Sequence, residues 1–167
     1  TEVTATGSGD IRHTDDSGNS SYSPSYAAMA MGAQTNAKGA RTIALGFDAT
    51  AKTSGDYAED MSDSSGKLTA IGAIAIGNNI NATGHASVVL GVESNASGTT
   101  SLAIGYKANA TGQNSYAVGN LATASAHGAI AFGYNTTSNG EYSITMGELS
   151  NAQEKYALAL GHGATVY

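Results

Sequence analysis

The sequence of 167 residues contains no cysteine, no tryptophan and one proline, Pro24. Without cysteine it cannot form disulfide scaffolds, cysteine-ligated zinc sites or thiol nucleophiles. Only 12% of the residues are charged, whereas disordered chains usually carry more charge and more proline. No apolar run approaches the length of a membrane-spanning helix, and no signal peptide opens the sequence. We therefore expect an ordered domain, with any export or anchoring segments outside this sequence.

Small residues take the place of the missing types, since the chain holds 22 glycines and 30 alanines. So many glycines disfavour a helical bundle, and their spacing lacks the three-residue period of collagen. The 7 basic and 13 acidic residues give a net charge of −6, which disfavours nucleic-acid binding.

A four-residue motif, large–small–large–glycine, occurs nine times along the chain. Successive motif glycines follow a constant 14-residue period, and the single exception is the longer interval from Gly46 to Gly77. That interval equals one period plus the length of the segment 54–70. The segment is therefore an insertion that preserves the phase of the repeat. The motif glycines are Gly32, Gly46, Gly77, Gly91, Gly105, Gly119, Gly133, Gly147 and Gly161.

We number the repeat so that the motif glycine is position 7. Positions 4 and 6 are large and apolar around a small position 5, which predicts a strand whose large side chains fill the interior. Positions 10 and 12 are mostly small, and positions 11 and 13 are polar, which predicts a second, thinner strand. Position 14 is usually glycine, which permits a turn. Two strands and two turns per repeat predict a β-solenoid.

This interpretation places the small column at position 5 on the outside. It would form a flat face for close packing between neighbouring chains, with Ala103 and Ala117 near its middle. The column comprises Ala30, Ala44, Ala75, Val89, Ala103, Ala117, Ala131, Thr145 and Ala159.

The segment 114–122, Asn-Ser-Tyr-Ala-Val-Gly-Asn-Leu-Ala, resembles the N-S-V-A-I-G-x-x-S repeat of YadA-like head domains. Segments 101–105 and 85–91 are variants of the same repeat. The resemblance covers residues 22–167, and residues 1–21 form a polar lead-in. It implies an all-β fold, a left-handed parallel β-roll (β-solenoid) in each chain. Three such chains would form the trimeric head of an autotransporter adhesin.

The resemblance also implies a function. A head of this kind is a virulence-associated adhesin on the bacterial cell surface, carried on the outer membrane by C-terminal segments absent from this sequence. Its partners would be host extracellular matrix proteins (collagen, fibronectin or laminin) or host cell-surface receptors. The alternative is a passive structural spacer, or a self-association module of a surface fibre.

Two groups of residues are candidate partner contacts. Aromatic side chains follow the motif glycine at position 8, where they would either anchor a partner or cover the ends of a thin core. These are Phe47, Tyr106 and Tyr134. The insertion would form a protruding loop with grouped carboxylates, which suits partner contact, Ca²⁺ or plain solvation, although no EF-hand spacing is present. Its candidates are Asp56, Tyr57, Glu59, Asp60 and Asp63.

Two further patterns have alternative interpretations. His85 and His127 both occupy position 1, so each would either form a three-histidine cluster across a threefold axis or lie at the surface. The Asn and Thr side chains of position 11 indicate either a hydrogen-bond ladder or an ice- or glycan-binding face. That column comprises Asn36, Thr50, Asn81, Asn95, Asn109, Thr123, Thr137 and Asn151.

No catalytic or nucleotide-binding motif is present in the sequence. A 14-residue period is not a multiple of six, which disfavours a hexapeptide acyltransferase. We therefore expect a protein that is not an enzyme, with no cofactor and no bound metal.

Overall fold

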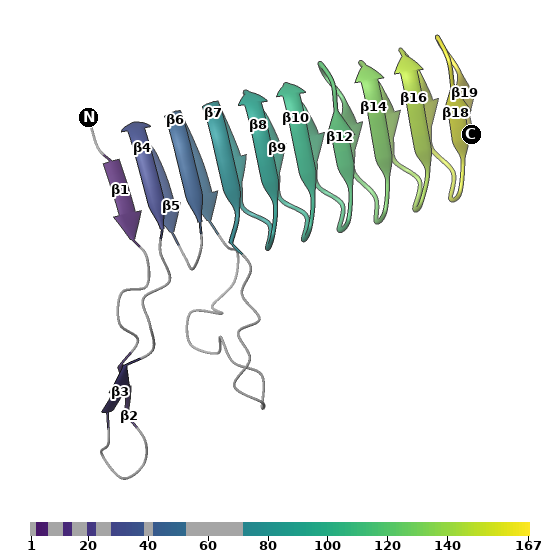
Figure 1. The fold of residues 1–167 in the computed structure, drawn as a ribbon. Coiled ribbons are helices and arrows are strands. Elements are labelled where there is room, and N and C mark those ends of the chain that lie inside the picture. Colours follow the sequence, from purple (N-terminus) through teal and green to yellow (C-terminus); the bar gives the residue numbers. More distant parts are fainter. Residues whose placement is uncertain (1–2, 7–11, 15–19, 23–27, 39–41, 53–71) are drawn as a thin grey trace.

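A computed structural model of the protein describes residues 3–6, 12–14, 20–22, 28–38, 42–52 and 72–167. These residues form a parallel β-solenoid and contain no helix (Figure 1). Seventeen strands make one continuous sheet that winds around the coils, and β2 (Arg12–Thr14) and β3 (Ser20–Tyr22) form a separate antiparallel pair. The all-β solenoid expected from the repeat is confirmed.

Each repeat forms one coil, with a front strand and a back strand. The front strands are β4 (Met29–Ala33), β8 (Val88–Val92), β10 (Leu102–Tyr106), β12 (Tyr116–Val118), β14 (Ile130–Tyr134), β16 (Ile144–Glu148) and β18 (Leu158–Leu160). The back strands are β5 (Thr35–Lys38), β9 (Asn95–Ala96), β11 (Asn109–Ala110), β13 (Thr123–Ala124), β15 (Thr137–Ser138), β17 (Asn151–Ala152) and β19 (Thr165–Val166). In two coils one continuous strand serves both sides, β6 (Ile43–Lys52) and β7 (Ile74–Ala82).

Parallel pairing joins equivalent positions of neighbouring coils. Ala103 is in register with Ala117, and Asn109 with Thr123, so each pair is separated by one period of the repeat. Across the insertion, Thr50 is in register with Asn81, and both occupy position 11. The phase is therefore kept across the insertion, as predicted.

The N-terminal segment, expected to be a polar lead-in, contributes a strand to the roll. In β1 (Val3–Thr6), Thr4 is in register with Asn36, although more than two periods of sequence separate them. Residues 3–6 show the small–polar alternation of positions 10–13, but so short a segment without the glycine motif is too weak a signal to recognise. The strands of the roll that flank residues 7–27 and 53–71 thus stop and resume at the same points of the repeat, since β1 and β6 end at position 13 and β4 and β7 begin at position 4.

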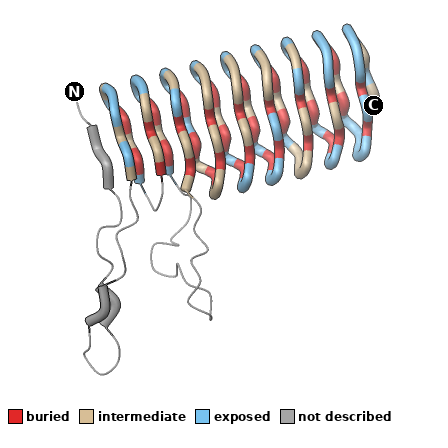
Figure 2. Tube along the Cα trace, viewed as in Figure 1, coloured by how far each residue is buried: buried red, intermediate tan, exposed pale blue. Residues whose placement is uncertain are grey.

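The interior is lined by the small residues, which corrects our assignment of the two faces. From Ala44 to Ala159, the position-5 side chains are at most 1% exposed within a single chain. Buried residues of positions 3, 10 and 12 complete the core (Figure 2). Ala103 and Ala117 therefore cannot form a contact face between chains.

The coil is too narrow for large side chains inside. Only two fully buried side chains among the described residues are larger than threonine, Ile80 and Val89. The side chains of positions 4 and 6 point outward instead and are half-buried or exposed. Alternation of large and small residues identifies a strand but does not say which of its two faces is inside. We assigned the large side chains to the interior because of their size, and that assignment was wrong.

The motif glycine allows each coil to bend while its neighbours stack closely. Gly105 has φ +136°, and a Cβ added there would lie 2.3 Å from the carbonyl oxygen of Gly119. Two further turn positions, 2 and 9, hold residues with left-handed φ, including Asn114 and Leu121. These turns give the roll two edges, which we call the position-8 edge (positions 8 and 9) and the position-2 edge (positions 1 and 2).

Candidate binding surfaces

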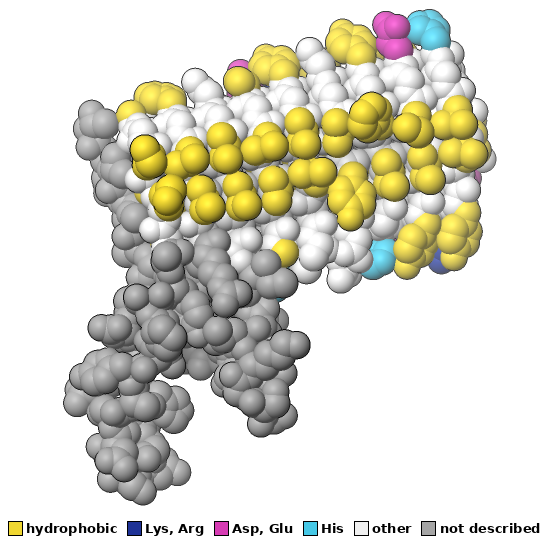
Figure 3. Space-filling model, viewed as in Figure 1, with side chains coloured by type: hydrophobic (Ala, Val, Ile, Leu, Met, Phe, Trp, Pro, Cys, Tyr) yellow, Lys and Arg dark blue, Asp and Glu magenta, His cyan; other side chains and the backbone are white. Residues whose placement is uncertain are grey.

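The first surface is an apolar front face made by the side chains of positions 4 and 6. It forms two rows that run the length of the described roll (Figure 3). Met31, Phe132 and Leu160 are each at least half exposed. Large apolar patches on a soluble protein usually mark an interface, so this face is suited to pack against another protein surface.

The position-8 edge holds the predicted aromatic candidates. Phe47, Tyr106 and Tyr134 are 51%, 40% and 48% exposed. Backbone hydrogen bonds join the turns that carry them to the equivalent turns of neighbouring coils. The Leu121 N–H donates to the Tyr106 carbonyl oxygen (2.8 Å), and the Leu149 N–H donates to that of Tyr134 (3.0 Å). This edge therefore presents its aromatic side chains from a regular backbone.

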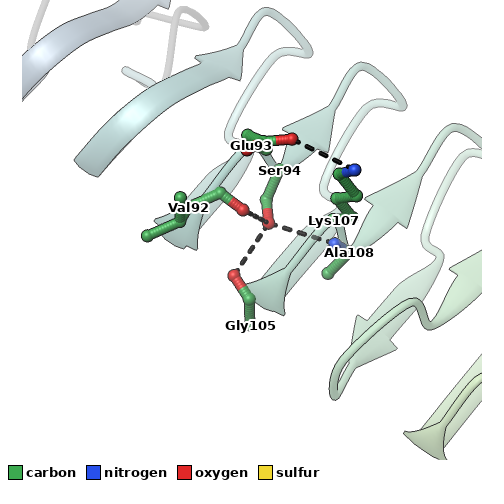
Figure 4. A network of polar contacts seen from close by, with 6 residues as sticks. All are labelled: Val92, Glu93, Ser94, Gly105, Lys107 and Ala108. Atoms are coloured by element: carbon green, nitrogen blue, oxygen red, sulfur yellow. Dashed lines mark hydrogen bonds and ion pairs between the residues drawn. The ribbon is translucent and has the colours of Figure 1, made fainter.

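A buried serine braces this edge on the inside (Figure 4). The Ser94 hydroxyl lies 2.9 Å from the Gly105 carbonyl oxygen and accepts a hydrogen bond from the Ala108 N–H (3.1 Å). Outside, Lys107 pairs with Glu93 at 3.4 Å. A hydrogen bond with Tyr106 and then the ion pair with Glu93 raise the pKa of Lys107. Neighbouring turns are thus tied together by side chains as well as by backbone.

The position-2 edge carries an aromatic cluster that sequence analysis missed. The rings of Tyr142 and Tyr156 stack with centroids 5.6 Å apart, and His127 meets Tyr142 edge-on at 5.0 Å. Lys155 lies 5.2 Å from the Tyr156 centroid and pairs with Glu141 at 2.9 Å, which lowers the pKa of Glu141. In the sequence, this cluster could have been recognised from the aromatic and charged residues that occupy positions 1 and 2 of three consecutive coils.

The two candidate histidines of position 1 do not meet within one chain. His85 and His127 lie three coils apart, or about 14 Å at the usual strand spacing. Within the described part of the chain, no three His, Asp or Glu side chains are placed to hold a metal ion. His13 lies in β2.

The back face, formed by positions 11 and 13, is polar. The Asn95 side-chain amide donates to that of Asn109 (3.1 Å) on the next coil. At position 13 the Ser125 hydroxyl donates to the side-chain oxygen of Asn139 on the next coil (2.6 Å). Of these two bonds only Asn95–Asn109 lies in the position-11 column, and the buried side-chain oxygens of Asn36 and Asn151 in that column have no partner among the described residues, so a continuous position-11 ladder stays a prediction.

The insertion candidates lie outside the described residues. They are Asp56, Tyr57, Glu59, Asp60 and Asp63. A search of the described residues for helices able to cross a membrane finds none.

Comparison with known families identifies the architecture. The family described as "YadA head domain repeat (2 copies)" matches residues 26–49, 82–108, 110–136 and 138–164, more than half of the chain. The chain belongs to the YadA head family. YadA head domains are structural, non-enzymatic parts of bacterial surface adhesins that associate as homotrimers, so the protein is an adhesin-type domain. No curated protein matches the chain.

Proposed function

We propose that this YadA head attaches bacteria to host extracellular matrix proteins or host cell receptors from the outer membrane. The observation that carries the proposal is the division of the surface into one apolar face and two edges bearing exposed aromatic residues. An apolar face suits packing between chains, and exposed aromatic edges suit contact with other proteins.

The homotrimer would form through the front face. Two large side chains per coil over nine coils leave an apolar surface that a soluble monomer rarely carries. Burying it between three chains would remove it from water, at about 25 cal/mol per Å². The edges and the polar back face would then remain available to host proteins.

Attachment would be multivalent. A threefold head offers each contact residue three times, and many heads on one cell raise the effective concentration of sites. The proposed contacts are Phe47, Tyr106 and Tyr134 at the position-8 edge, with the insertion residues Asp56, Tyr57, Glu59, Asp60 and Asp63 as a second group.

The test is adhesion of the purified chain to immobilised collagen, fibronectin, laminin and epithelial cells, at low and high salt. We expect binding that persists at high salt, because neutral positions dominate the repeat and exposed charges are screened within about 8 Å at physiological salt. Loss of binding at high salt would instead assign attachment to the acidic residues. A chain that adheres to none of these surfaces is a spacer, and the proposal is then wrong.

A further inference from the structure

One asparagine of the back face is followed directly by a glycine. In the whole sequence this pair occurs once, at Asn139 and Gly140, which hold positions 13 and 14 of their coil. Asn139 is exposed and Gly140 is buried. The other coils in which glycine follows a described position 13 have no amide there, since the residues are Lys38, Thr83, Ser97 and Thr111. An asparagine beside a glycine can react with its own backbone, and asparagine is among the chemically labile residues.

The stacking of the coils fixes the glycine of this pair. A Cβ added at Gly140 would collide with the carbonyl oxygen of Glu154 on the next coil. The same clash with the next coil would occur at Gly98. Position 14 is therefore held by glycine for packing, and no side chain shields the Gly140 nitrogen from its neighbour.

The N–H group of Gly140 is weakly held. It lies 3.3 Å from the carbonyl oxygen of Ala152, beyond the usual range of such bonds. The Asn139 N–H donates to the same oxygen at 2.9 Å, so that acceptor is already engaged. The Gly140 nitrogen therefore loses little when its hydrogen bond is broken.

The preceding coil activates the side chain of the asparagine. The Ser125 hydroxyl donates a hydrogen bond to the Oδ1 atom of Asn139 at 2.6 Å. This bond draws electron density from the Cγ atom, which makes it a better electrophile. A donor at this oxygen also stabilises the negative charge that develops there when a nucleophile attacks.

We propose that Asn139 is a site of spontaneous deamidation in the folded protein. The Gly140 nitrogen gives its proton to hydroxide and attacks the Cγ atom of Asn139, which forms a cyclic imide. The bond from Cγ to Nδ2 breaks, and this nitrogen takes a proton from water and leaves as ammonia. A second water molecule then opens one of the two imide bonds, which gives aspartate or isoaspartate. Water and hydroxide are the only reactants from outside the chain.

The two products affect the roll differently. Each replaces a neutral amide with a carboxylate, so the net charge of the chain changes from −6 to −7. Isoaspartate also adds a methylene group to the main chain, where the N–H groups of both residues face Ala152. It should therefore weaken the pairing of two coils, whereas aspartate changes only the charge. The modified fraction rises with the age of the protein, a property that goes beyond adhesion and does not depend on it.

The test is incubation of the full chain in warm, mildly alkaline buffer below its melting temperature. Peptide mapping by mass spectrometry, with enzymatic methylation of isoaspartate, locates the products. We expect Asn139 to be converted, and faster at higher pH, because the Gly140 nitrogen must lose a proton. Asn114 is the internal control and should stay intact. It is also exposed and accepts a bond from the Thr100 hydroxyl of the preceding coil, but a serine follows it.

Three variants isolate the roles of the neighbours. Ser125→Ala should slow conversion about tenfold, the effect of losing one hydrogen bond. Ser97→Ala makes the same change at position 13 of a coil that does not touch Asn139, and it should leave the rate unchanged. Asn139→Gln should abolish the isoaspartate signal at this position.

Three results would overturn the inference. These are an Asn139 that stays intact or reacts no faster than Asn114, a Ser125→Ala variant that reacts as fast as the wild type, or conversion that begins only above the melting temperature. Thermal melting of each variant shows that the rates refer to folded protein. Adhesion is not part of the readout, so failure of the proposed function leaves this test unaffected.

Discussion

At the scale of single residues, the narrow interior makes the role of each side chain depend on its position in the repeat. Ser94 and Ser150 both occupy position 10 and are both buried. The Ser94 hydroxyl bonds the next coil, whereas that of Ser150 has no partner among the described residues. The same residue type at the same position is therefore a brace in one coil and an unsatisfied polar group in another.

Replacing these serines separates the two roles. Ser94→Ala should lower the free energy of unfolding by about 1–2 kcal/mol, because the Ala108 N–H loses its acceptor. Ser150→Ala should leave it unchanged or raise it, since an unpaired buried hydroxyl is removed. Denaturant unfolding of both variants measures the difference, and equal losses would contradict the assigned roles.

A second pair of variants tests which side of the front strand is inside. Ala117→Leu should destabilise the chain by about 1–3 kcal/mol or more, because the core has no space for the added atoms. Val118→Leu, one residue further on, should be tolerated because its side chain points outward. Thermal unfolding of the two variants decides the matter. The opposite order of stabilities would restore the assignment of faces that the structure corrects.

At the scale of elements, the strands on either side of residues 53–71 pair in the register of the repeat. Deleting residues 54–70 should leave assembly and melting temperature nearly unchanged, because the strands on either side keep their register. Light scattering and thermal melting provide the test. A deletion variant that fails to fold would show that these residues are needed by the roll.

At the position-2 edge, an ion pair between neighbouring coils, Lys155 with Glu141, can be followed by pH titration. The hydrogen bond and ion pair with Lys155 lower the pKa of Glu141, so the carboxyl group should titrate below its ordinary value of 4.5. The stabilisation from this pair is present above that value and is lost as the pH falls through the lower pKa of the folded protein. NMR titration measures the midpoint, and Lys155→Met should return it toward 4.5. An unchanged midpoint in that variant would exclude the pair as the cause.

Sequence reasoning predicted the period, the parallel register and the phase-preserving insertion. Those features follow from the spacing of the motif glycines. Glycine is required there because a Cβ, as at Gly105, would collide with the backbone of the next coil. It assigned the wrong face to the interior, because the alternation around Ala117 is the same whichever side is buried. The cluster around Tyr142 was missed because it unites turn residues from three coils, none of which stands out alone.

At the scale of the whole molecule, the front face governs assembly. Ile104→Asp should disrupt the proposed homotrimer, because a carboxylate would then be buried in an apolar contact. Thr111→Asp places the same charge on the exposed back face and should leave the assembly intact. Sedimentation analysis of the two variants measures the mass of the particle. Equal behaviour of both would exclude the front face as the contact between chains.

The constant cross-section of the coils also bears on how such a protein changes over generations. Because each described coil pairs with the coils directly before and after it, an in-frame duplication of one repeat adds a layer without disturbing those already present. Selection can therefore adjust the reach of the head separately from the side chains that it displays. A duplicated layer begins with a copy of an existing edge and is then free to diverge, so one gene can come to carry several different contact surfaces along a single axis.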